Sequence, residues 1–354
     1  MAIIISDDDV RQHLSMAECI EAMRVAFRDY AEGKAVTMPR VRYRAETPDP
    51  NRQYSANVHV GAVPSYGMAC VRAGSNCIME DSTSPGRKIQ SNPEPVNWTV
   101  IILYDLATAE PMAFLHESYL SGLRVGATTG AAVDAIARDD VVELGLFGTG
   151  RQARSNATAI CTVRPSIKRI RVFSPTTEHR EHFASHLDLP GVEIVPVDSP
   201  EAVIAGADIV CCATNTTKPL FDGNLLEEGQ MVISIVNTDV IAQRSEIDAT
   251  GFARADDIIV NDWASVESNN QVELLDAMES GAVDADHVHE LGDLLAERKT
   301  VKQQDGKIIY YKNNTGLGMQ FAAAGAVVYR KMKDMDTNRT IPREWLASEK
   351  YSQS

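Results

Sequence analysis

The chain has few cysteines, and their spacing excludes a disulfide framework. No two of them form a Cys-x-x-Cys pair in the 354 residues. Without such a pattern we expect buried or free thiols in a reducing compartment. The six cysteines are Cys19, Cys70, Cys77, Cys161, Cys211 and Cys212.

Apolar runs of transmembrane length are also absent, and the first residues carry acids instead of the basic start of a secretory signal. We therefore expect a cytoplasmic protein without a membrane partner. Basic charge is scarce as well: 34 Lys and Arg stand against 49 Asp and Glu, a formal net charge of −15. This balance argues against nucleic acid as a partner but leaves room for a local basic pocket that binds a small carboxylate.

The most informative stretch is an apolar run, Leu144 to Phe147, that meets Gly148-x-Gly150-x-x-Ala153 and then a helical pattern from 151 to 161. In a strand–turn–helix unit the first glycine permits a tight turn, the second admits a pyrophosphate, and the alanine allows close helix packing. The alternative is a purely structural turn. We predict a dinucleotide site whose contacts include Gly148, Thr149, Gly150, Arg151 and Gln152.

Further apolar segments predict a doubly wound parallel sheet of Rossmann type around this turn. Residues 126–315 form the expected dinucleotide-binding domain. Residues 1–125 and 316–354 form an expected α+β substrate-binding and dimerisation domain, with strands in an antiparallel or mixed sheet. The parallel strands are predicted at 141–147, 167–173, 192–197, 207–213, 229–236 and 255–261, followed by a short strand at 307–311.

The end of the second predicted strand bears on the choice of cofactor. An NAD site is expected to carry an acid there for the ribose 2′-hydroxyl, but the residue is Ser174. Thr176, Thr177 and Arg180 follow and are suited to a 2′-phosphate. The sequence therefore favours NADP over NAD by a modest margin.

Later strand ends supply polar residues for the same site, because ligands bind at the carboxyl ends of such strands. Thr214 and Asn215 follow one strand, and Val236 and Asn237 follow the next, so we predict all four at the cofactor. Asp239 is the carboxylate placed to reach the nicotinamide, which makes it the candidate general acid or base. A turn-stabilising aspartate is the alternative.

Five arginines in the first 125 residues are candidates for binding a carboxylate. In a strand, Arg40, Arg42 and Arg44 share one face, either solvated or holding a substrate carboxylate. Arg72 ends an apolar strand, so its side chain points outward or into a pocket. Arg124 stands near the start of a helix rich in small residues, where a cation suggests a nearby anion or a structural ion pair.

Other titratable clusters have simpler explanations. Asp7 to Asp9 are expected in the first turn of a helix rather than at a metal, and Ser15-x-x-Glu18 predicts a capping box. His179, His182 and His186 share a helix face that we expect to be solvated, so no metal site is predicted. His287 and His289 are expected in a solvated connection.

With these residues assembled, the chain resembles the ornithine cyclodeaminase/mu-crystallin family over nearly its whole length. The specific elements are Arg124-Val-Gly-Ala and Gly148-Thr-Gly-Arg-Gln-Ala153. The resemblance implies a homodimer that handles amino acids and cyclic imines with NAD(P). It implies that Arg40 and Arg124 grip the substrate carboxylate, that Asp239 is the general base, and that Gly318 lies at the cofactor.

Two departures from the family pattern narrow the expected activity. Arg72 stands where the family has a lysine, and an arginine does not relay protons easily. Gly316-Leu-Gly318 replaces the family's Ser-Leu-Gly, without the acidic pair that follows it there. We therefore predict an NAD(P)-dependent imino-acid reductase or amino-acid dehydrogenase, with Arg72 in a catalytic or substrate-binding role. The alternatives are a cyclodeaminase with bound NAD and a non-catalytic binding protein like mu-crystallin.

Overall fold

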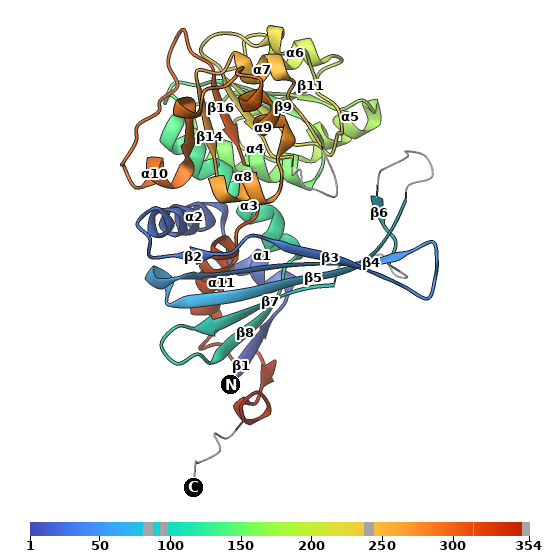
Figure 1. Ribbon diagram of the computed structural model, residues 1–354, viewed down its shortest axis with the longest axis vertical. Coiled ribbons are helices and arrows are strands. Elements are labelled where there is room, and N and C mark those ends of the chain that lie inside the picture. The colour runs from blue at the N-terminus through green and yellow to red at the C-terminus, as the bar shows by residue number, and fades with distance from the viewer. Residues whose placement is uncertain (81–87, 93–95, 97, 237–243, 314, 349–354) are drawn as a thin grey trace. The chain divides into compact units, whose positions relative to one another are not determined.

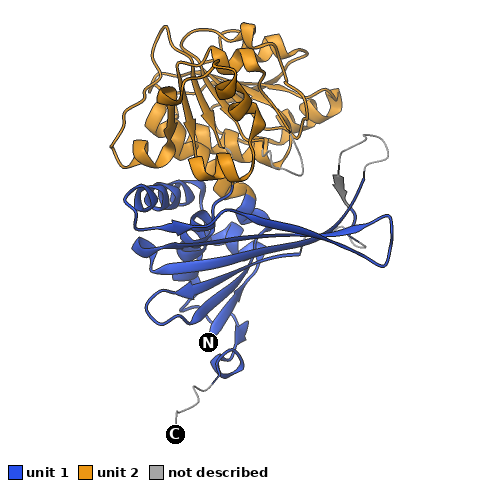
Figure 2. Ribbon diagram, in the orientation of Figure 1, with its two compact units in different colours: residues 1–121, 316–354 blue, residues 122–315 orange. Residues whose placement is uncertain are grey.

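A computed structural model describes residues 1–80, 88–92, 96, 98–236, 244–313 and 315–348. Contacts divide the chain into two compact units, residues 1–121 with 316–354 and residues 122–315 (Figure 2). The sequence placed this division a few residues later, after position 125. Helix α3 (Ser118–Ile136) runs across the division, so its first turn belongs to one unit and the remainder to the other.

The first unit is built on a mixed nine-stranded sheet in the order β17-β1-β8-β7-β5-β4-β2, with β3 on β4 and β6 on β5. β1 and β8 are parallel, and the other pairs are antiparallel. Its elements are β1 (Ala2–Ile5), α1 (Asp7–His13), α2 (Met16–Ala31), β2 (Val36–Thr37), β3 (Val41–Glu46), β4 (Gln53–Val63), β5 (Met68–Glu80), β6 (Lys88–Gln90), β7 (Trp98–Asp105), β8 (Pro111–His116), α11 (Gly318–Met332) and β17 (Thr340–Ile341), with short 3-10 turns η1 (Pro64–Tyr66) and η4 (Arg343–Trp345).

α2 begins directly after Ser15, as the predicted capping box requires, and α1 begins at Asp7, in the acidic run expected in a first turn. The Ser6 and Ser15 side chains accept hydrogen bonds from the backbone N–H of Asp9 and Glu18, and both acids bond back to the cap. The chain leaves α2 through Gly33 at φ +72°. The charged segment that follows α11 returns to the sheet, because β17 pairs with β1.

The two faces of this sheet have opposite character. α11 packs against α2, β4 and β5 (Figure 1), and the sheet face below α11 carries Arg72 and His59, which pair across β4 and β5. The opposite face is apolar and open: Val41 is 59%, Tyr43 51% and Trp98 63% exposed. Cross-strand register shows that these three side chains share that face with Val58, Ala73 and Val100.

The second unit is an eight-stranded, wholly parallel sheet in the order β11-β10-β9-β12-β13-β16-β14-β15. The strand order reverses between β9 and β12, which is where ligands bind in folds of this kind. The elements after α3 are β9 (Glu143–Phe147), α4 (Arg151–Val163), β10 (Arg169–Phe173), α5 (Thr177–His186), β11 (Glu193–Pro196), α6 (Pro200–Ile204), β12 (Ile209–Cys212), η2 (Gly223–Leu225), β13 (Met231–Ser234), α7 (Ala249–Ala253), β14 (Asp257–Val260), α8 (Trp263–Ser268), α9 (Val272–Glu279), η3 (Ala285–His287), β15 (Val288–Glu290), α10 (Leu291–Leu295) and β16 (Ile309–Lys312).

The parallel set extends further than the sequence indicated. β14 does not close it, because β15 adds an edge strand and β16 inserts between β13 and β14. The prediction that His289 is solvated is wrong: it lies in β15, is 8% exposed, and its Nε2 lies 2.7 Å from Asp257 Oδ1. Within β15 only His289 is buried, and the polar sequence around it gave no sign of this.

The remaining sequence-level expectations concern thiols and membranes. None of the six cysteines forms a disulfide, and burial raises the pKa of Cys70 and of Cys161 to about 12, which makes these two thiols poor nucleophiles. Among the described residues, no helix combines the length and the apolar character needed to cross a bilayer.

Candidate functional site

The turn after β9 requires glycine at its first position. Gly148 has φ +102°, and a Cβ placed there would lie 2.3 Å from the carbonyl oxygen of Ala213, just beyond β12. The Gly148 N–H donates to the Phe173 carbonyl at 2.9 Å. The turn thus contacts the ends of both β10 and β12, at the point where the strand order reverses.

Packing does not explain the second glycine. Gly150 is the N-cap of α4, and a Cβ there would meet no protein atom within 4 Å. Its side chain cannot cap the helix, so the first N–H groups of α4 are left to other acceptors. A backbone open to close approach at a helix N-terminus fits a dinucleotide pyrophosphate. Thr149 and Gln152 are half-buried and Arg151 is exposed.

Small residues bring α3 against α4. The Ser155 hydroxyl donates to the Gly122 carbonyl at 2.8 Å, and a Cβ on Gly126 would lie 2.3 Å from the Ser155 Oγ. The Asn313 amide donates to the Val125 carbonyl at 2.9 Å, which ties α3 to the end of β16. Arg124 lies on the part of α3 that is held by α4 and by the end of β16, and it is 8% exposed.

The end of β10 is arranged differently from the sequence-based expectation. Arg180 lies on α5, and its Nη1 donates to the Ser174 carbonyl at 3.1 Å. Its Nη2 contacts the Asp198 carboxylate. The Arg180 side chain is only 10% exposed, whereas Thr176, the N-cap of α5, is exposed and makes no side-chain cap bond. Of the three groups predicted to suit a 2′-phosphate, Thr176 and Thr177 are therefore exposed and Arg180 is buried.

A buried carboxylate that the sequence did not single out joins the ends of β12 and β13. Glu246 is 0% exposed, and its Oε1 accepts from the Thr214 N–H at 2.6 Å and from the Thr214 hydroxyl at 2.7 Å. Its Oε2 accepts from the Ser234 hydroxyl at 2.9 Å, the Ile235 N–H at 3.1 Å and the Val236 N–H at 3.0 Å. Burial raises the pKa of Glu246, and the hydrogen bonds from Thr214, Ser234 and Val236 act in the opposite direction.

Two predicted cofactor residues, Thr214 and Val236, are thus held by one side chain. Asn215 is exposed beside Thr214. Asn237 and the candidate general acid or base, Asp239, lie outside the described residues.

A second buried charge lies one strand further along the same edge. Lys312 pairs in register with Ser234 of β13 and Val260 of β14, is 0% exposed, and forms an ion pair with Glu273 of α9. Burial lowers the pKa of Lys312 to about 8, and the Glu246 carboxylate acts against this shift. The Lys312–Glu273 ion pair was not predicted, because an apolar strand that ends in lysine resembles a strand whose last residue is exposed to solvent.

In the first unit, Arg72 points inward instead of outward. Its Nη2 donates to Glu117 Oε2 at 3.0 Å, its Nη1 contacts the Asn57 side chain, and its guanidinium lies 5.6 Å from the centre of the Phe321 ring. The Arg72 and Glu117 side chains are 12% and 4% exposed. The positive charge is therefore balanced by a buried carboxylate that the sequence analysis did not identify.

The other arginines of this unit do not form the expected row. Arg40 precedes β3, and only Arg42 and Arg44 share a strand face. Gly318 lies in the core of the first unit, where a Cβ would be 2.0 Å from the Val60 carbonyl oxygen, so close packing explains this glycine.

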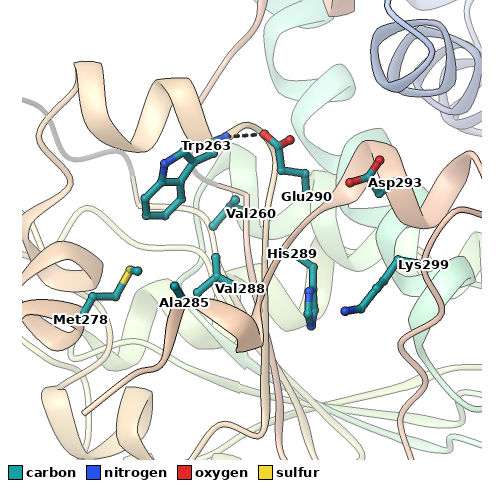
Figure 3. A pocket seen from close by; sticks show the side chains of 9 residues that line it. All are labelled: Val260, Trp263, Met278, Ala285, Val288, His289, Glu290, Asp293 and Lys299. Atoms are coloured by element: carbon teal, nitrogen blue, oxygen red, sulfur yellow. Dashed lines mark hydrogen bonds between the residues drawn. The ribbon is translucent and has the colours of Figure 1, made fainter. Parts of the chain in front are cut away.

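Apart from these residues, a cavity of about 420 Å³ lies beside β14 and β15 (Figure 3). Trp263 and Met278 line one side, and His289 and Lys299 line the other. The Glu290 carboxylate accepts a hydrogen bond from the backbone N–H of Trp263 at 2.6 Å. Because Glu290 and His289 already bond within the unit, we assign this cavity no function. Among the described residues no group of three His, Cys, Asp or Glu is arranged to bind a metal ion.

Known proteins resemble this chain in sequence and in fold. The sequence model of the ornithine cyclodeaminase/mu-crystallin family matches residues 2–336. A delta(1)-pyrroline-2-carboxylate reductase of Bacillus cereus is 25% identical over 342 residues, which cover 96% of this chain and 99% of that protein.

Two solved structures share the fold over nearly the whole chain. The delta(1)-pyrroline-2-carboxylate reductase of Thermococcus litoralis, in complex with NADH and L-proline, has a TM-score of 0.79 at 24% identity, covering 94% of this chain and 98% of that one. An archaeal alanine dehydrogenase dimer with bound NAD has a TM-score of 0.78 at 23% identity, covering 95% and 97%.

Proposed function

Since the chain belongs to the ornithine cyclodeaminase/mu-crystallin family, we propose that it is an NAD(P)-dependent oxidoreductase acting on the carbon–nitrogen bond of a small imino or amino acid. The observation that carries the proposal is the Gly148–Gly150 turn. It lies where the strand order reverses, and its second glycine is not explained by packing. The 25% identity to a pyrroline-2-carboxylate reductase supports the same reaction class.

In this proposal the bound dinucleotide supplies the hydride that the carbon of a C=N bond receives. Arg40, Arg72 and Arg124 keep the carboxylate-binding roles that the sequence predicts. Holding the carboxylate orients the reacting carbon, and orientation of this kind contributes a large part of many enzymatic rate enhancements. Asp239 donates the proton that the nitrogen gains when the imine becomes an amine.

Arg72, which stands where the family has a lysine, favours reduction over cyclodeamination. Its guanidinium lies 3.0 Å from a buried carboxylate oxygen of Glu117. A charged arginine binds carboxylates well but does not shuttle protons as a lysine can.

The test is oxidation of NADH and NADPH with pyrroline-2-carboxylate, piperideine-2-carboxylate, and 2-oxo acids mixed with amines. We expect turnover with at least one of them. Asp239→Asn should lower kcat by about 100-fold or more while leaving the Kd for NADH within about threefold, because general acid catalysis contributes about 10²–10⁴.

Other results of this assay would contradict the proposal. Ammonia release from ornithine or lysine without added cofactor would indicate a cyclodeaminase. Nucleotide binding without turnover, unchanged in the Asp239→Asn variant, would indicate a binding protein.

We further propose that the cofactor is NAD(H). The Arg180 guanidinium already donates to the Ser174 carbonyl and pairs with the Asp198 carboxylate. The two solved structures described above contain NADH or NAD. Arg180→Ala should then leave the ratio of the Kd values for NADPH and NADH within about threefold of its original value. The preference for NADP stays a prediction of the sequence. It would gain support if this variant bound NADPH at least about tenfold more weakly with NADH binding unchanged.

We also propose a homodimer formed through the open apolar face of β3, β4, β5 and β7. Exposed apolar patches of this kind mark interaction surfaces. Val41 and Trp98, both more than half exposed, lie on this face. Sedimentation equilibrium should give twice the chain mass, and a double Val41→Glu, Trp98→Glu variant should shift it towards monomer. A wild-type monomer at micromolar concentration would contradict the proposal.

A further inference from the structure

Glu246 is unusual because its single carboxylate accepts hydrogen bonds from five donors at two neighbouring strand ends. The donors are two groups of Thr214 after β12, and the Ser234 hydroxyl with the N–H groups of Ile235 and Val236 at the end of β13. The parallel pairing of β12 and β13 stops at Cys212 and Ser234. Beyond those residues the Ile235 N–H still donates to the Cys212 carbonyl at 3.2 Å, and Glu246 adds the further bonds that join the two strand ends.

The donors around this position favour a carboxylate side chain. A carboxylate has about four lone-pair sites and no proton, so it accepts from several donors at once. A glutamine of the same shape would turn its NH₂ group towards N–H or O–H donors on one side. Hydrogen bonds to a charged acceptor contribute about 1.5–3 kcal/mol each, and a buried donor without an acceptor is costly. The five donors therefore select glutamate specifically.

The location connects this carboxylate to the cofactor. Thr214 follows Ala213, whose carbonyl oxygen contacts the Gly148 turn closely enough to exclude a side chain there. Val236 immediately precedes the segment that contains Asn237 and Asp239. Glu246 thus binds the backbone that follows Ala213, beside the Gly148 turn, and the backbone that leads into the segment containing Asn237 and Asp239.

We infer that Glu246 is a positioning residue: it fixes the ends of β12 and β13, so that Thr214 and the backbone at Val236 are held in place before the nicotinamide half of the cofactor binds. The inference rests on the proposed dinucleotide site. Glu246 acts through Thr214 and Val236 and does not itself bind the substrate.

The test is a graded series of variants in the full-length protein. Glu246→Gln disturbs both strand ends, and Ser234→Ala removes one donor while it leaves Glu246 and its other bonds in place. Glu290→Gln is the matched control: this carboxylate also ends a strand of the same sheet, and it accepts a backbone N–H at 2.6 Å, but it lies at the far edge, on β15.

Two readouts separate positioning from stability. Hydrogen exchange without cofactor should be faster at Thr214, Ile235 and Val236 in Glu246→Gln. The Kd for NADH, measured by fluorescence on folded protein, should rise at least about tenfold in Glu246→Gln and about threefold in Ser234→Ala, with Glu290→Gln unchanged. If Glu246→Gln does not fold, Ser234→Ala carries the test.

The failures are distinguishable. A wild-type protein that binds neither NADH nor NADPH would overturn the proposed function, and this inference with it. If the wild type binds NADH and reduces an imine, while Glu246→Gln and Ser234→Ala lose thermal stability but keep the wild-type Kd, only the positioning role is overturned. Equal weakening of NADH binding in Glu290→Gln would also overturn it.

Discussion

A Gly148→Ala variant is expected to lose most of its dinucleotide affinity and part of its stability. The backbone at Gly148 has φ +102°, and the new methyl group would lie 2.3 Å from the Ala213 carbonyl oxygen. Strained backbone of this kind costs about 1–3 kcal/mol, and the β12 end must also move. We expect the Kd for NADH, measured by fluorescence titration, to rise by about 100-fold or more.

Gly150→Ala separates affinity from folding at the same turn. A methyl group there meets no protein atom within 4 Å, so the free energy of unfolding should fall by no more than about 1 kcal/mol, the cost of alanine at an N-cap. The Kd for NADH should nevertheless rise at least about tenfold, because the methyl group stands where a pyrophosphate approaches.

The control for backbone strain is Gly191→Ala. Gly191 has φ +78° and no protein atom near its Cβ position, so this variant should be destabilised without weaker NADH binding. Undiminished NADH binding in both Gly148→Ala and Gly150→Ala would place the dinucleotide elsewhere.

Lys312→Met should be among the most destabilising single substitutions in the chain. Lys312 is 0% exposed and its partner Glu273 4%, so removing the lysine leaves a buried carboxylate without its partner. Breaking a buried ion pair from one side costs about 3–5 kcal/mol. The double variant Lys312→Met, Glu273→Leu should recover most of this loss, because two apolar side chains of similar size need no compensation. Urea denaturation followed by tryptophan fluorescence measures both; equal stability of the single and double variants would contradict the coupling.

The same lysine gives the stability a defined pH dependence. Burial lowers its pKa from 10.5 to about 8. Between these two values the unfolded chain binds the proton and the folded protein does not, so the contribution of Lys312 to stability rises with pH across this window. The wild-type protein should show this rise in urea titrations between pH 8 and 10, relative to the double variant. Parallel pH profiles of the two proteins would argue against a depressed pKa.

Prediction from the sequence worked best where the signal is local. Gly148, Gly150 and Ala153 occupy fixed offsets between an apolar strand and a helix, and the structure places the turn at the reversal of strand order. The predicted capping box at Ser15 is local in the same way, since donor and acceptor are three residues apart. Offsets this short determine the geometry before any tertiary contact forms.

Prediction failed where partners are distant in the chain. Glu246 bonds to Thr214, 32 residues away, and Arg72 to Glu117, 45 residues away. Nothing in the neighbourhood of Glu246 separates it from a surface acid, and Arg180 looked available for a 2′-phosphate because Asp198, 18 residues later, was not expected beside it.

The sequence by itself determined the glycine-rich turn after β9, the parallel strand–helix alternation and the family, because each depends on residue types at short, fixed spacings. The tertiary structure alone decided that β16 enters the sheet between β13 and β14. That insertion brings Lys312 beside Ser234, and the packing of the strand ends gives Glu246 its five donors. Strand order and the burial of charge are settled by contacts between distant segments, and no local pattern encodes them.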